Sequence, residues 1–461
     1  MKTCLIYPPV STVTVSCRPP LGLAYLASVL LKKGSEVDII SSDAEGLNAD
    51  KTVSRILDLS PDLVGISVLT TMAGRSLRMI ENIKRRRNRT KIIVGGPHPT
   101  VFPEEFLNGG ADVVVRGEGE DTLSELYDHF EGGASLDRIK GISYKEDGQF
   151  VHNPGRELIK DINTIPLPAW ELFPIRRYKS NFRMKGFSLP IMSSRGCPHH
   201  CTFCYKTIHG DVFRTRKPEL IVDEIAYLKD RFGIEEFDIM DDSFASDPKT
   251  AMEVCEQIIS RKISLPWTLP SGIRISAVSG KFLEKLKAAG CYRIALGIES
   301  GNQRILDCVK KGIRLEQARD AMKLFKKFKM KSVGYFIIGI PEETKETIED
   351  TIRFAIELDL DYAQFSKATP FPGTAMYDQL KSENRILARS WDDYDCFLKS
   401  RPLFMHDNLS SNEIDDRLRE AYRRFFLRPK CVLKHLAAIG SFREAANLIR
   451  NTLRFHKLHI S

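Results

Sequence analysis

The sequence predicts an α/β protein with an N-terminal doubly wound parallel sheet, a partial (β/α)6 barrel and a small helical C-terminal region. Short apolar runs alternate with helical patterns over residues 1–140. The same alternation starts again at Ser188 and produces six further strand candidates. A hydrophobic content of 42% and a charged content of 28% over 461 residues fit a globular protein whose large cores need no disulfide staples.

Residues 1–140 carry the pattern of the first sheet. Each strand candidate is short and continuously apolar, and a stretch with helical periodicity follows it. Parallel strands joined by helices predict a doubly wound sheet, whose ligands bind at the carboxyl ends of the strands. The expected strands are residues 2–7, 36–40, 63–67, 91–94 and 113–115, and the expected helices are residues 21–32, 50–59, 72–87, 104–108 and 121–130.

Glycines and small polar residues gather directly after three of these strands. Glycine lets a backbone approach a large ligand closely, although the same residue also makes tight strand–helix turns. Because three such loops meet at one edge of the sheet, the sequence predicts a ligand there. The candidate contacts are Ser67, Thr70, Gly95, Gly96, Gly117 and Glu118.

A hairpin around Asp147-Gly148 and a proline-rich stretch near Pro166 separate the two α/β parts. The second part reads as a partial barrel, whose active site lies at the carboxyl ends of its strands. Its expected strands are residues 189–193, 236–240, 267–271, 293–297, 332–338 and 363–367, and its expected helices are residues 218–232, 248–261, 280–289, 315–328 and 345–357. The expected domains are residues 1–140, 141–185, 186–385 and 386–461.

Three cysteines, Cys197, Cys201 and Cys204, directly follow the first strand of the barrel. Thiolates are the ligands of iron–sulfur clusters, and three ligands on a four-iron cluster leave one iron open for a small molecule. Structural zinc is the alternative, with His199 or His200 as a fourth ligand. The remaining cysteines are scattered, which indicates a reducing compartment.

The Cys-x3-Cys-x2-Cys spacing, with Phe203 before the last cysteine, resembles the radical S-adenosylmethionine (SAM) superfamily. The resemblance implies a [4Fe–4S] cluster whose open iron binds SAM. An electron then cleaves SAM to a 5′-deoxyadenosyl radical, which abstracts hydrogen from the substrate. SAM contacts are implied at the strand ends, at Phe203, Asp241, Asp242, Arg274, Gly297, Glu299, Gly339 and Pro341. No catalytic acid–base or hydrogen-donor residue can be named.

A doubly wound domain before such a barrel resembles the cobalamin-binding class of this superfamily, the class B methyltransferase-like enzymes. Pro19-Pro20-Leu21-Gly22, Gly95-Gly96-Pro97-His98 and Gly117-Glu118-Gly119-Glu120 carry the resemblance, while an Asp-x-His-x-x-Gly motif is absent. It implies cobalamin at the strand-end loops and methyl transfer to an unactivated carbon of a small-molecule or lipid-like substrate. The alternatives are a cyclase or rearrangement enzyme without methyl transfer, a non-catalytic cobalamin or iron–sulfur sensor, and a zinc-stabilised binding module.

Basic residues gather towards the C-terminus. From Arg417 to Ser461, eleven Lys and Arg stand against two Asp and Glu, which accounts for the net charge of +9. This favours an anionic partner, and the amphipathic pattern over residues 441–461 leaves two roles open, a cap on the barrel and peripheral contact with a membrane. No nucleic-acid-binding fingerprint is present, so we expect no nucleic acid.

The sequence also predicts where the protein works. It shows no signal-peptide pattern at the N-terminus and no run of 18 apolar residues, which favours the cytoplasm, with peripheral membrane association through the basic tail. The resemblance further implies an electron donor such as flavodoxin or ferredoxin.

Overall fold

The computed structural model describes residues 1–10, 18–178, 184, 186–394 and 401–437. The chain forms two compact units. The first comprises Met1–Pro198, Tyr205–Glu236 and Arg389–Asp392, and the second comprises His199–Cys204, Phe237–Ala388 and Asp393–Ser461. The boundaries of these units differ from the expected domain boundaries. Two segments of the expected barrel, residues 186–198 and 205–236, belong to the first unit.

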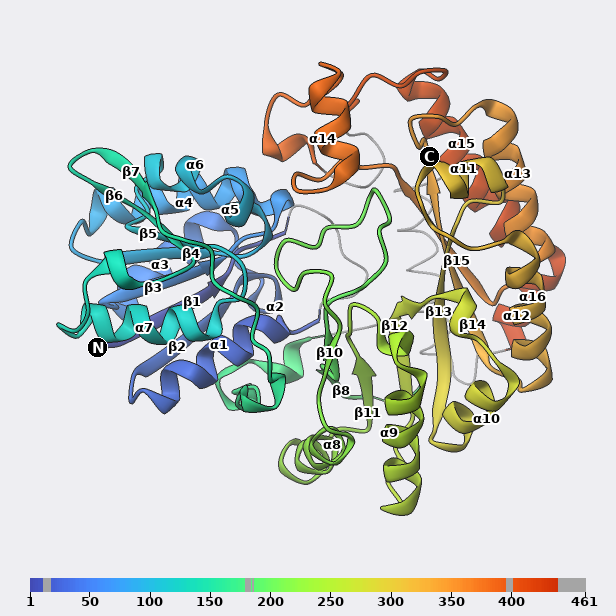
Figure 1. The fold of residues 1–461 in the computed structure, drawn as a ribbon, viewed down its shortest axis with the longest axis horizontal. Coiled ribbons are helices and arrows are strands. Elements are labelled where there is room, and N and C mark those ends of the chain that lie inside the picture. Colours follow the sequence, from blue (N-terminus) through green and yellow to red (C-terminus); the bar gives the residue numbers. More distant parts are fainter. Residues whose placement is uncertain (11–17, 179–183, 185, 395–400, 438–461) are drawn as a thin grey trace. The chain divides into compact units, whose positions relative to one another are not determined.

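The first unit is built on a sheet that is parallel through its first five strands (Figure 1). An antiparallel hairpin extends one edge. The spatial order is β2 (Glu36–Ser41), β1 (Lys2–Tyr7), β3 (Leu63–Ser67), β4 (Lys91–Gly95), β5 (Val113–Val115), β6 (Ile142–Glu146) and β7 (Gln149–His152). The expected doubly wound sheet and its hairpin are therefore confirmed.

Helices join the parallel strands and cover both faces of this sheet. They are α1 (Leu21–Lys32), α2 (Ser42–Glu45), α3 (Ala49–Leu59), α4 (Ala73–Arg86), α5 (Pro97–Val101), α6 (Pro103–Asn108) and α7 (Glu120–Phe130). Helix α1 packs against α7, and α3 packs against α4. Neighbouring residues of a strand point to opposite faces, so the continuously apolar strands can be buried on both sides.

One face of the sheet forms a closed core under α3, α4 and α6. Ile6, Val64 and Val94 contribute strand side chains to it, and Ile80 and Phe106 contribute helix side chains. All five are at most 2% exposed. This packing fixes the sheet rigidly, so the loops after its strands start from well-defined positions.

Further elements of the first unit lie after the proline-rich stretch. They are β8 (Ser188–Ile191), the two-stranded antiparallel ribbon of β9 (Ser194–Arg195) and β10 (Arg214–Thr215), and α8 (Pro218–Phe232). The ribbon was not expected from the sequence, because strands of two residues carry no periodicity.

The second sheet carries its strands in the order β15 (Tyr362–Lys367), β14 (Lys331–Ile338), β13 (Cys291–Glu299), β12 (Trp267–Ile273), β11 (Glu236–Ile239) and β8. From β11 to β15 the strands pair in parallel and in chain order. Between them run α9 (Pro248–Ser260), α10 (Gly280–Ala288), α11 (Gln303–Cys308), α12 (Leu315–Lys327) and α13 (Lys345–Glu357). This is the strand–helix order expected of a partial (β/α)6 barrel.

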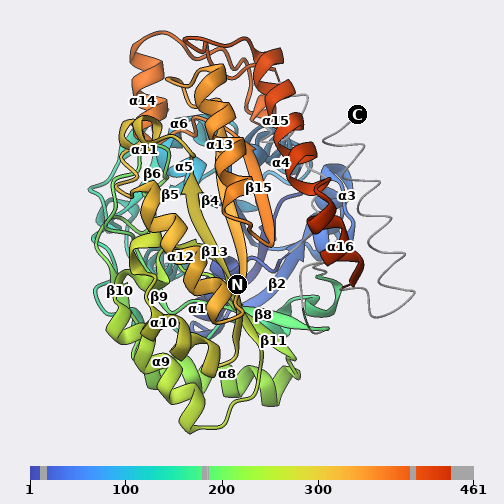
Figure 2. The same ribbon diagram turned by 90° about the vertical axis from the view of Figure 1, so that its right-hand side faces the viewer.

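The C-terminal part adds α14 (Ala375–Ser382), α15 (Ser411–Phe426) and α16 (Pro429–Ala437). Helix α15 packs against β15 and α13 (Figure 2). Tyr422 donates a hydrogen bond of 2.8 Å to the Phe365 carbonyl and packs edge-on against the Phe365 ring. The amphipathic pattern over residues 441–461 lies outside the described residues. In the described part of the chain, no helix combines the length and apolarity needed to span a membrane.

Candidate active site

The loop that carries Cys197 is tightly held in the first unit. Gly196 follows β9 with a φ of +82°, and a Cβ on it would lie 2.2 Å from the Val212 carbonyl oxygen. Only glycine fits this position, because a side chain would clash with backbone as well as strain it. The Cys197 N–H then donates to the Gly210 carbonyl at 3.3 Å. The position of Cys197 is thus set by its immediate neighbours.

The other two cysteines, Cys201 and Cys204, interact with each other in the second unit. The Cys204 N–H donates to the Cys201 carbonyl at 3.2 Å. A hydrogen bond from the Cys204 thiol lowers the pKa of the Cys201 thiol to about 6, and the positive charges of Lys311 and Arg274 act in the same direction. The same hydrogen bond raises the pKa of Cys204. The lowered pKa favours the thiolate form of Cys201, the form in which a cysteine ligates a metal.

The backbone between these two cysteines is anchored as well. The Thr202 N–H donates to the Val309 carbonyl at 3.1 Å, and the Thr202 carbonyl accepts from the Met376 N–H at 2.9 Å. Across the described residues, no three His, Cys, Asp or Glu side chains gather closely enough to hold a metal ion. Assignment of the cysteines as cluster ligands therefore rests on their spacing and on their thiolate chemistry.

Glu299 and Lys311 form a buried ion pair in the second unit. Lys311 Nζ lies 2.8 Å from Glu299 Oε1, and the two side chains are only 11% and 9% exposed. Glu299 ends β13 with a φ of +68°, a conformation that is strained for a residue with a side chain. The Lys311 Nζ also lies 6.0 Å from the centre of the Phe203 ring. The structure thus brings two of the expected SAM contacts, Glu299 and Phe203, to one lysine.

Lys311 was not expected from the sequence. It sits in the run Val309-Lys310-Lys311-Gly312 after α11, where neither lysine is marked by a pattern. Arg274 supports this segment, since its Nη2 donates to the carbonyl oxygens of Lys311 and Gly312. The Glu299 carboxylate raises the pKa of Lys311 against the opposing effect of burial, so the ammonium stays charged.

The remaining SAM candidates lie within or just after the carboxyl ends of β11, β13 and β14. Asp241 is buried and Asp242 is exposed. A Cβ on Gly297 would lie 2.7 Å from both Glu299 Oε1 and Lys311 Nζ, so this glycine makes room for the ion pair. Gly339 turns with a φ of +85° just before the buried Pro341.

A buried carboxyl group, Glu343, closes the turn after β14. Its Oε2 accepts hydrogen bonds from the N–H groups of Gly339 at 2.6 Å and Ile340 at 3.0 Å. Burial raises the pKa of Glu343 to about 8, although these two hydrogen bonds act in the opposite direction. Its Oε1 has no hydrogen-bond partner among the described residues.

In the first unit, the loops after β3, β4 and β5 meet at the carboxyl edge of the sheet, as expected. Ser67 and Gly95 are paired neighbours that end β3 and β4. Gly96 has a φ of +105°, and a Cβ on it would lie 2.9 Å from the Val68 carbonyl oxygen. Gly117 has a φ of +80°, and no described atom lies within 4 Å of where its Cβ would be. Gly96 thus allows a close backbone approach at this edge, and Gly117 leaves the space beside its Cα open.

Glu118 is placed in a buried network of charges. Its carboxylate accepts from Arg195 Nη1 at 2.9 Å, from Arg214 Nη1 at 2.9 and 3.0 Å, and from the Ile159 N–H at 2.7 Å. These donors hold the pKa of Glu118 below its usual value, although burial alone would raise it. Contact with cobalamin stays a prediction for Glu118, because the described structure already accounts for both of its oxygens.

Thr70 and His98 belong to a second polar cluster at the same edge. Thr70 Oγ1 lies 3.2 Å from His98 Nδ1, and His98 Nε2 lies 3.3 Å from Glu105 Oε2. Trp391 Nε1 donates to both Glu105 oxygens at 2.8 and 2.9 Å, and the Trp391 and His98 ring centres are 4.4 Å apart. Both nitrogens of His98 are therefore engaged. Trp391 could not have been anticipated, because it returns from 286 residues further along the chain.

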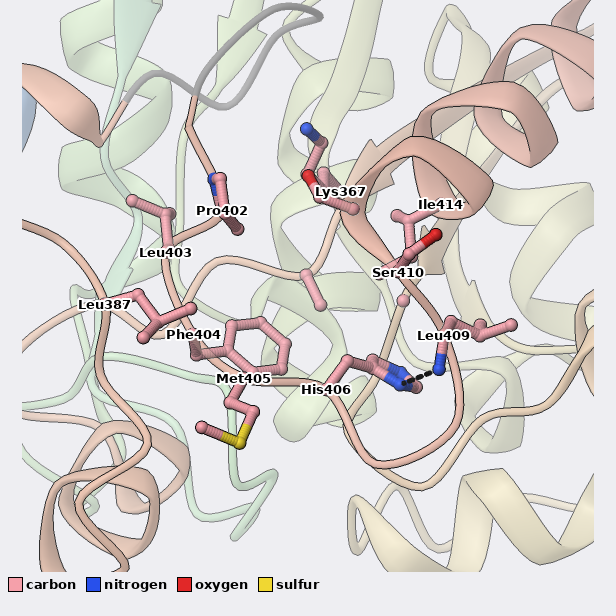
Figure 3. Close-up of a pocket in the computed structure, with 13 residues that line it drawn as sticks. Lys367, Leu387, Pro402, Leu403, Phe404, Met405, His406, Leu409, Ser410 and Ile414 are labelled. Atoms are coloured by element: carbon pink, nitrogen blue, oxygen red, sulfur yellow. Dashed lines mark hydrogen bonds between the residues drawn. The ribbon is translucent and has the colours of Figure 1, made fainter.

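A cavity of about 230 Å³ lies beside the carboxyl ends of β14 and β15 (Figure 3). Most of the labelled side chains around it are apolar, and Lys367 and His406 are the basic ones. Lys367 Nζ lies 2.5 Å from Asp415 Oδ1, so its charge is balanced. The apolar lining residues include Leu387, Leu403, Phe404, Met405, Leu409 and Ile414.

His406 is neutral in this wall. Its Nδ1 accepts from the Leu409 N–H (Figure 3) and from the Asn408 N–H. Its Nε2 therefore carries the hydrogen that is donated to the Ile340 carbonyl at 2.7 Å. Burial lowers the pKa of His406, which agrees with this neutral form. His406 thus joins the backbone at Ile340 to the backbone at Asn408 and Leu409 by hydrogen bonds, and it adds no charge to the cavity.

Comparison with known proteins identifies the family of the chain. The B12 binding domain model matches residues 9–127, and the Radical SAM superfamily model matches residues 191–355. An uncharacterized methyltransferase of Pyrococcus horikoshii is 37% identical over 95% of this chain and 95% of its own. The chain belongs to the cobalamin-binding radical SAM family. The expected cofactor set of a [4Fe–4S] cluster, SAM and cobalamin is confirmed at the level of this family.

Another relative in the family is the cytidylyl-2-hydroxyethylphosphonate methyltransferase of Streptomyces wedmorensis, 30% identical over 78% of this chain and 77% of its own. The solved structure of the methyltransferase TsrM from Kitasatospora setae, with tryptophan and a SAM analogue bound, has a TM-score of 0.73 at 18% identity. It covers 93% of this chain and 89% of its own. The expected fold class is thereby confirmed, and so is the expectation of an enzyme.

Proposed function

We propose that this enzyme transfers a methyl group to an unactivated carbon of a small-molecule or lipid-like substrate. The observation that supports this most directly is the Pyrococcus horikoshii methyltransferase, which matches both cofactor modules over nearly the full length. The tryptophan bound to TsrM shows that a protein of this fold takes a small molecule. The largely apolar cavity beside β14 and β15 supports a substrate with an apolar portion.

We assign Cys197, Cys201 and Cys204 as the ligands of the cluster. Their thiols fit iron, and the positive charge of Lys311 favours the thiolate form of Cys201. When bound, the cluster and SAM supply the radical that activates a substrate carbon. Glu299 holds the Lys311 ammonium in place, and Arg274 holds the backbone beneath it. These residues thus place positive charge near Cys201 and take no part in the reaction themselves.

The cobalamin-binding edge is assigned to the loops after β3, β4 and β5. Gly95 and Gly96 bring the backbone close to the edge, and Gly117 leaves the space beside it open. Ser67 and Thr70 are the polar candidates on the neighbouring loop. When bound, cobalamin supplies the methyl group that is transferred.

A second candidate function is cyclisation without methyl transfer. The anaerobic magnesium-protoporphyrin IX monomethyl ester cyclase of Rubrivivax gelatinosus is 29% identical over 89% of this chain and 74% of its own. A cyclase would consume SAM as a radical source only. It would yield 5′-deoxyadenosine without the second product, S-adenosylhomocysteine, that methyl transfer requires.

The partners complete the proposal. We propose a flavodoxin or ferredoxin as electron donor, and the cytoplasm as location. Peripheral contact with a membrane is proposed for the basic tail, whose charge excess would bind anionic headgroups.

The test is anaerobic reconstitution with iron, sulfide and hydroxocobalamin, followed by SAM and a strong reductant. We expect bound cobalamin, an iron–sulfur chromophore, 5′-deoxyadenosine and S-adenosylhomocysteine. The Cys201→Ala variant should lose the chromophore and 5′-deoxyadenosine while keeping cobalamin. Stoichiometric zinc in place of iron, or a cluster without SAM cleavage, would refute the proposal, and 5′-deoxyadenosine alone would favour the cyclase.

A further inference from the structure

The segment that carries the three cysteines is bracketed in sequence by two residues that contact the cobalamin-binding edge. Arg195 precedes Cys197 by two residues, and Tyr205 directly follows Cys204. Arg195 and Tyr205 both lie in the first unit, together with the loops after β4 and β5. Their contacts run to the same loops that we assign to cobalamin.

The contact on the Arg195 side is a buried and charge-balanced network. Arg195 donates through Nη1 to Glu118 and through Nη2 to Glu120, and all three side chains are at most 8% exposed. Arg214, paired with Arg195 across the β9–β10 ribbon, also donates to Glu118. Two cations and two anions thus neutralise one another, which is the condition under which buried charges are tolerated.

This network ties two short backbone segments together. Glu118 and Glu120 lie within five residues of the end of β5, and Glu120 is the first residue of α7. A carboxylate at that position is further stabilised by the helix dipole. On the other side, Arg195 is followed by Gly196 and Cys197, which the Val212 and Gly210 backbone confines. Displacement of the β5–α7 loop would therefore pull on the backbone of Cys197.

The contact on the Tyr205 side is a hydrogen bond to the loop after β4. The Tyr205 hydroxyl donates to the Pro97 carbonyl at 2.6 Å. Pro97 follows Gly95 and Gly96, so the acceptor lies in the glycine loop after β4.

We infer that Arg195 and Tyr205 are positioning residues that couple cobalamin binding to the cluster loop. Cobalamin that orders the loops after β4 and β5 fixes Glu118, Glu120 and Pro97, and these contacts then hold both ends of the cysteine segment. By reciprocity, a cluster that orders the cysteine segment raises the affinity for cobalamin by the same factor. This inference rests on the proposed function, because it needs both cofactors to bind.

The test measures the dissociation constant of hydroxocobalamin in the full chain with and without the reconstituted cluster. We expect cobalamin to bind about 5-fold or more tightly to the cluster-loaded wild type, in the usual range of such coupling. Tyr205→Phe removes only the hydroxyl, and Glu120→Gln removes one charge of the network. In each variant the ratio of the two constants should fall towards 1.

A matched control is Lys84→Gln. It removes an ion pair of similar kind, Lys84 Nζ to Asp112 Oδ2 at 2.6 Å, which lies just before β5 and so at the opposite edge of the sheet. This variant should keep the wild-type ratio. If Glu120→Gln does not fold, Tyr205→Phe still tests the coupling, because the loss of one hydroxyl group should leave the fold intact.

Three outcomes separate the inference from the proposed function. If both cofactors bind wild type independently, or if Tyr205→Phe keeps the full ratio, the coupling is refuted while the proposed function stands. If both cofactors bind with coupling but no methyl group is transferred, the proposed function fails and the coupling stands. If cobalamin does not bind at all, both are refuted.

Discussion

Replacing Glu343 by glutamine should make the second unit less sensitive to alkaline pH. The buried carboxyl has a pKa of about 8 instead of 4.5, chiefly because burial disfavours the charged form. A carboxyl whose pKa is raised by folding stabilises the fold fully below its ordinary pKa. That stabilisation is lost as the pH rises through about 8. The neutral amide of glutamine has no such loss.

The size of the effect follows from the two pKa values. A difference between 4.5 and about 8 corresponds to about 5 kcal/mol when titration is complete. Between pH 5 and pH 9 the wild type should lose about 4 kcal/mol relative to Glu343→Gln. The amide keeps an oxygen for the N–H groups of Gly339 and Ile340, and its NH₂ takes the place of the Oε1 atom. Any cost of burying that NH₂ is independent of pH.

Hydrogen exchange read by mass spectrometry is the suitable assay, because a chain with two compact units does not unfold as one two-state system. Peptides covering β14 and α13 should show opening free energies that diverge between wild type and Glu343→Gln as pH rises. The exposed Glu284→Gln serves as control and should show no divergence. A constant difference between wild type and Glu343→Gln from pH 5 to 9 would refute the assignment of a raised pKa.

Three further changes, one of them with a matched control, test other parts of the structure. Gly96→Ala should destabilise the first unit by about 1–3 kcal/mol and weaken cobalamin retention, because of its positive φ and the nearby backbone. Its control, Gly22→Ala in an open helical position, should be neutral or stabilising by up to about 1 kcal/mol when both variants are measured by hydrogen exchange. Arg216→Met leaves the fully buried Glu224 without its cation and should cost about 3–5 kcal/mol by hydrogen exchange in α8, and Arg216→Met with Glu224→Leu should largely restore the wild-type value. Trp391→Phe loses an N–H donor to a carboxylate and should cost about 1–3 kcal/mol by hydrogen exchange in α6.

The strands were predictable because their apolar runs are continuous and end sharply. The strands at Leu63–Ser67 and Val113–Val115 have the expected bounds. Helix α5 (Pro97–Val101) was missed because Gly95-Gly96-Pro97 predicts a turn, and five residues are too few to show a helical period. Helix α14 was missed although Thr374 caps it by accepting from the Tyr377 N–H, since the preceding prolines indicated a loop.

Spacing alone names Cys197, Cys201 and Cys204 as cluster ligands, and this assignment stays a prediction. The candidate site was not predictable where a side chain acquires its role from a distant partner. Lys311 becomes important only because the chain returns it to Glu299. Glu118 lies in the expected loop, but the structure shows that Arg195 and Arg214 bind its carboxylate. Local sequence patterns do not predict ion pairs between residues so far apart in the chain.

The return of Trp391 to Glu105 has a consequence for the nascent chain. The indole is synthesised 286 residues after the carboxylate that it binds. At about 5–20 residues per second, translation delays this contact by roughly 15–60 s. During that interval Glu105 lacks the indole donor, and His98 has only the rings of Phe102 and Phe106 beside it. The contact that completes this edge of the first unit therefore forms only after residue 391 has been synthesised. A chain that stops before Trp391 would leave the Glu105 carboxylate without its indole donor.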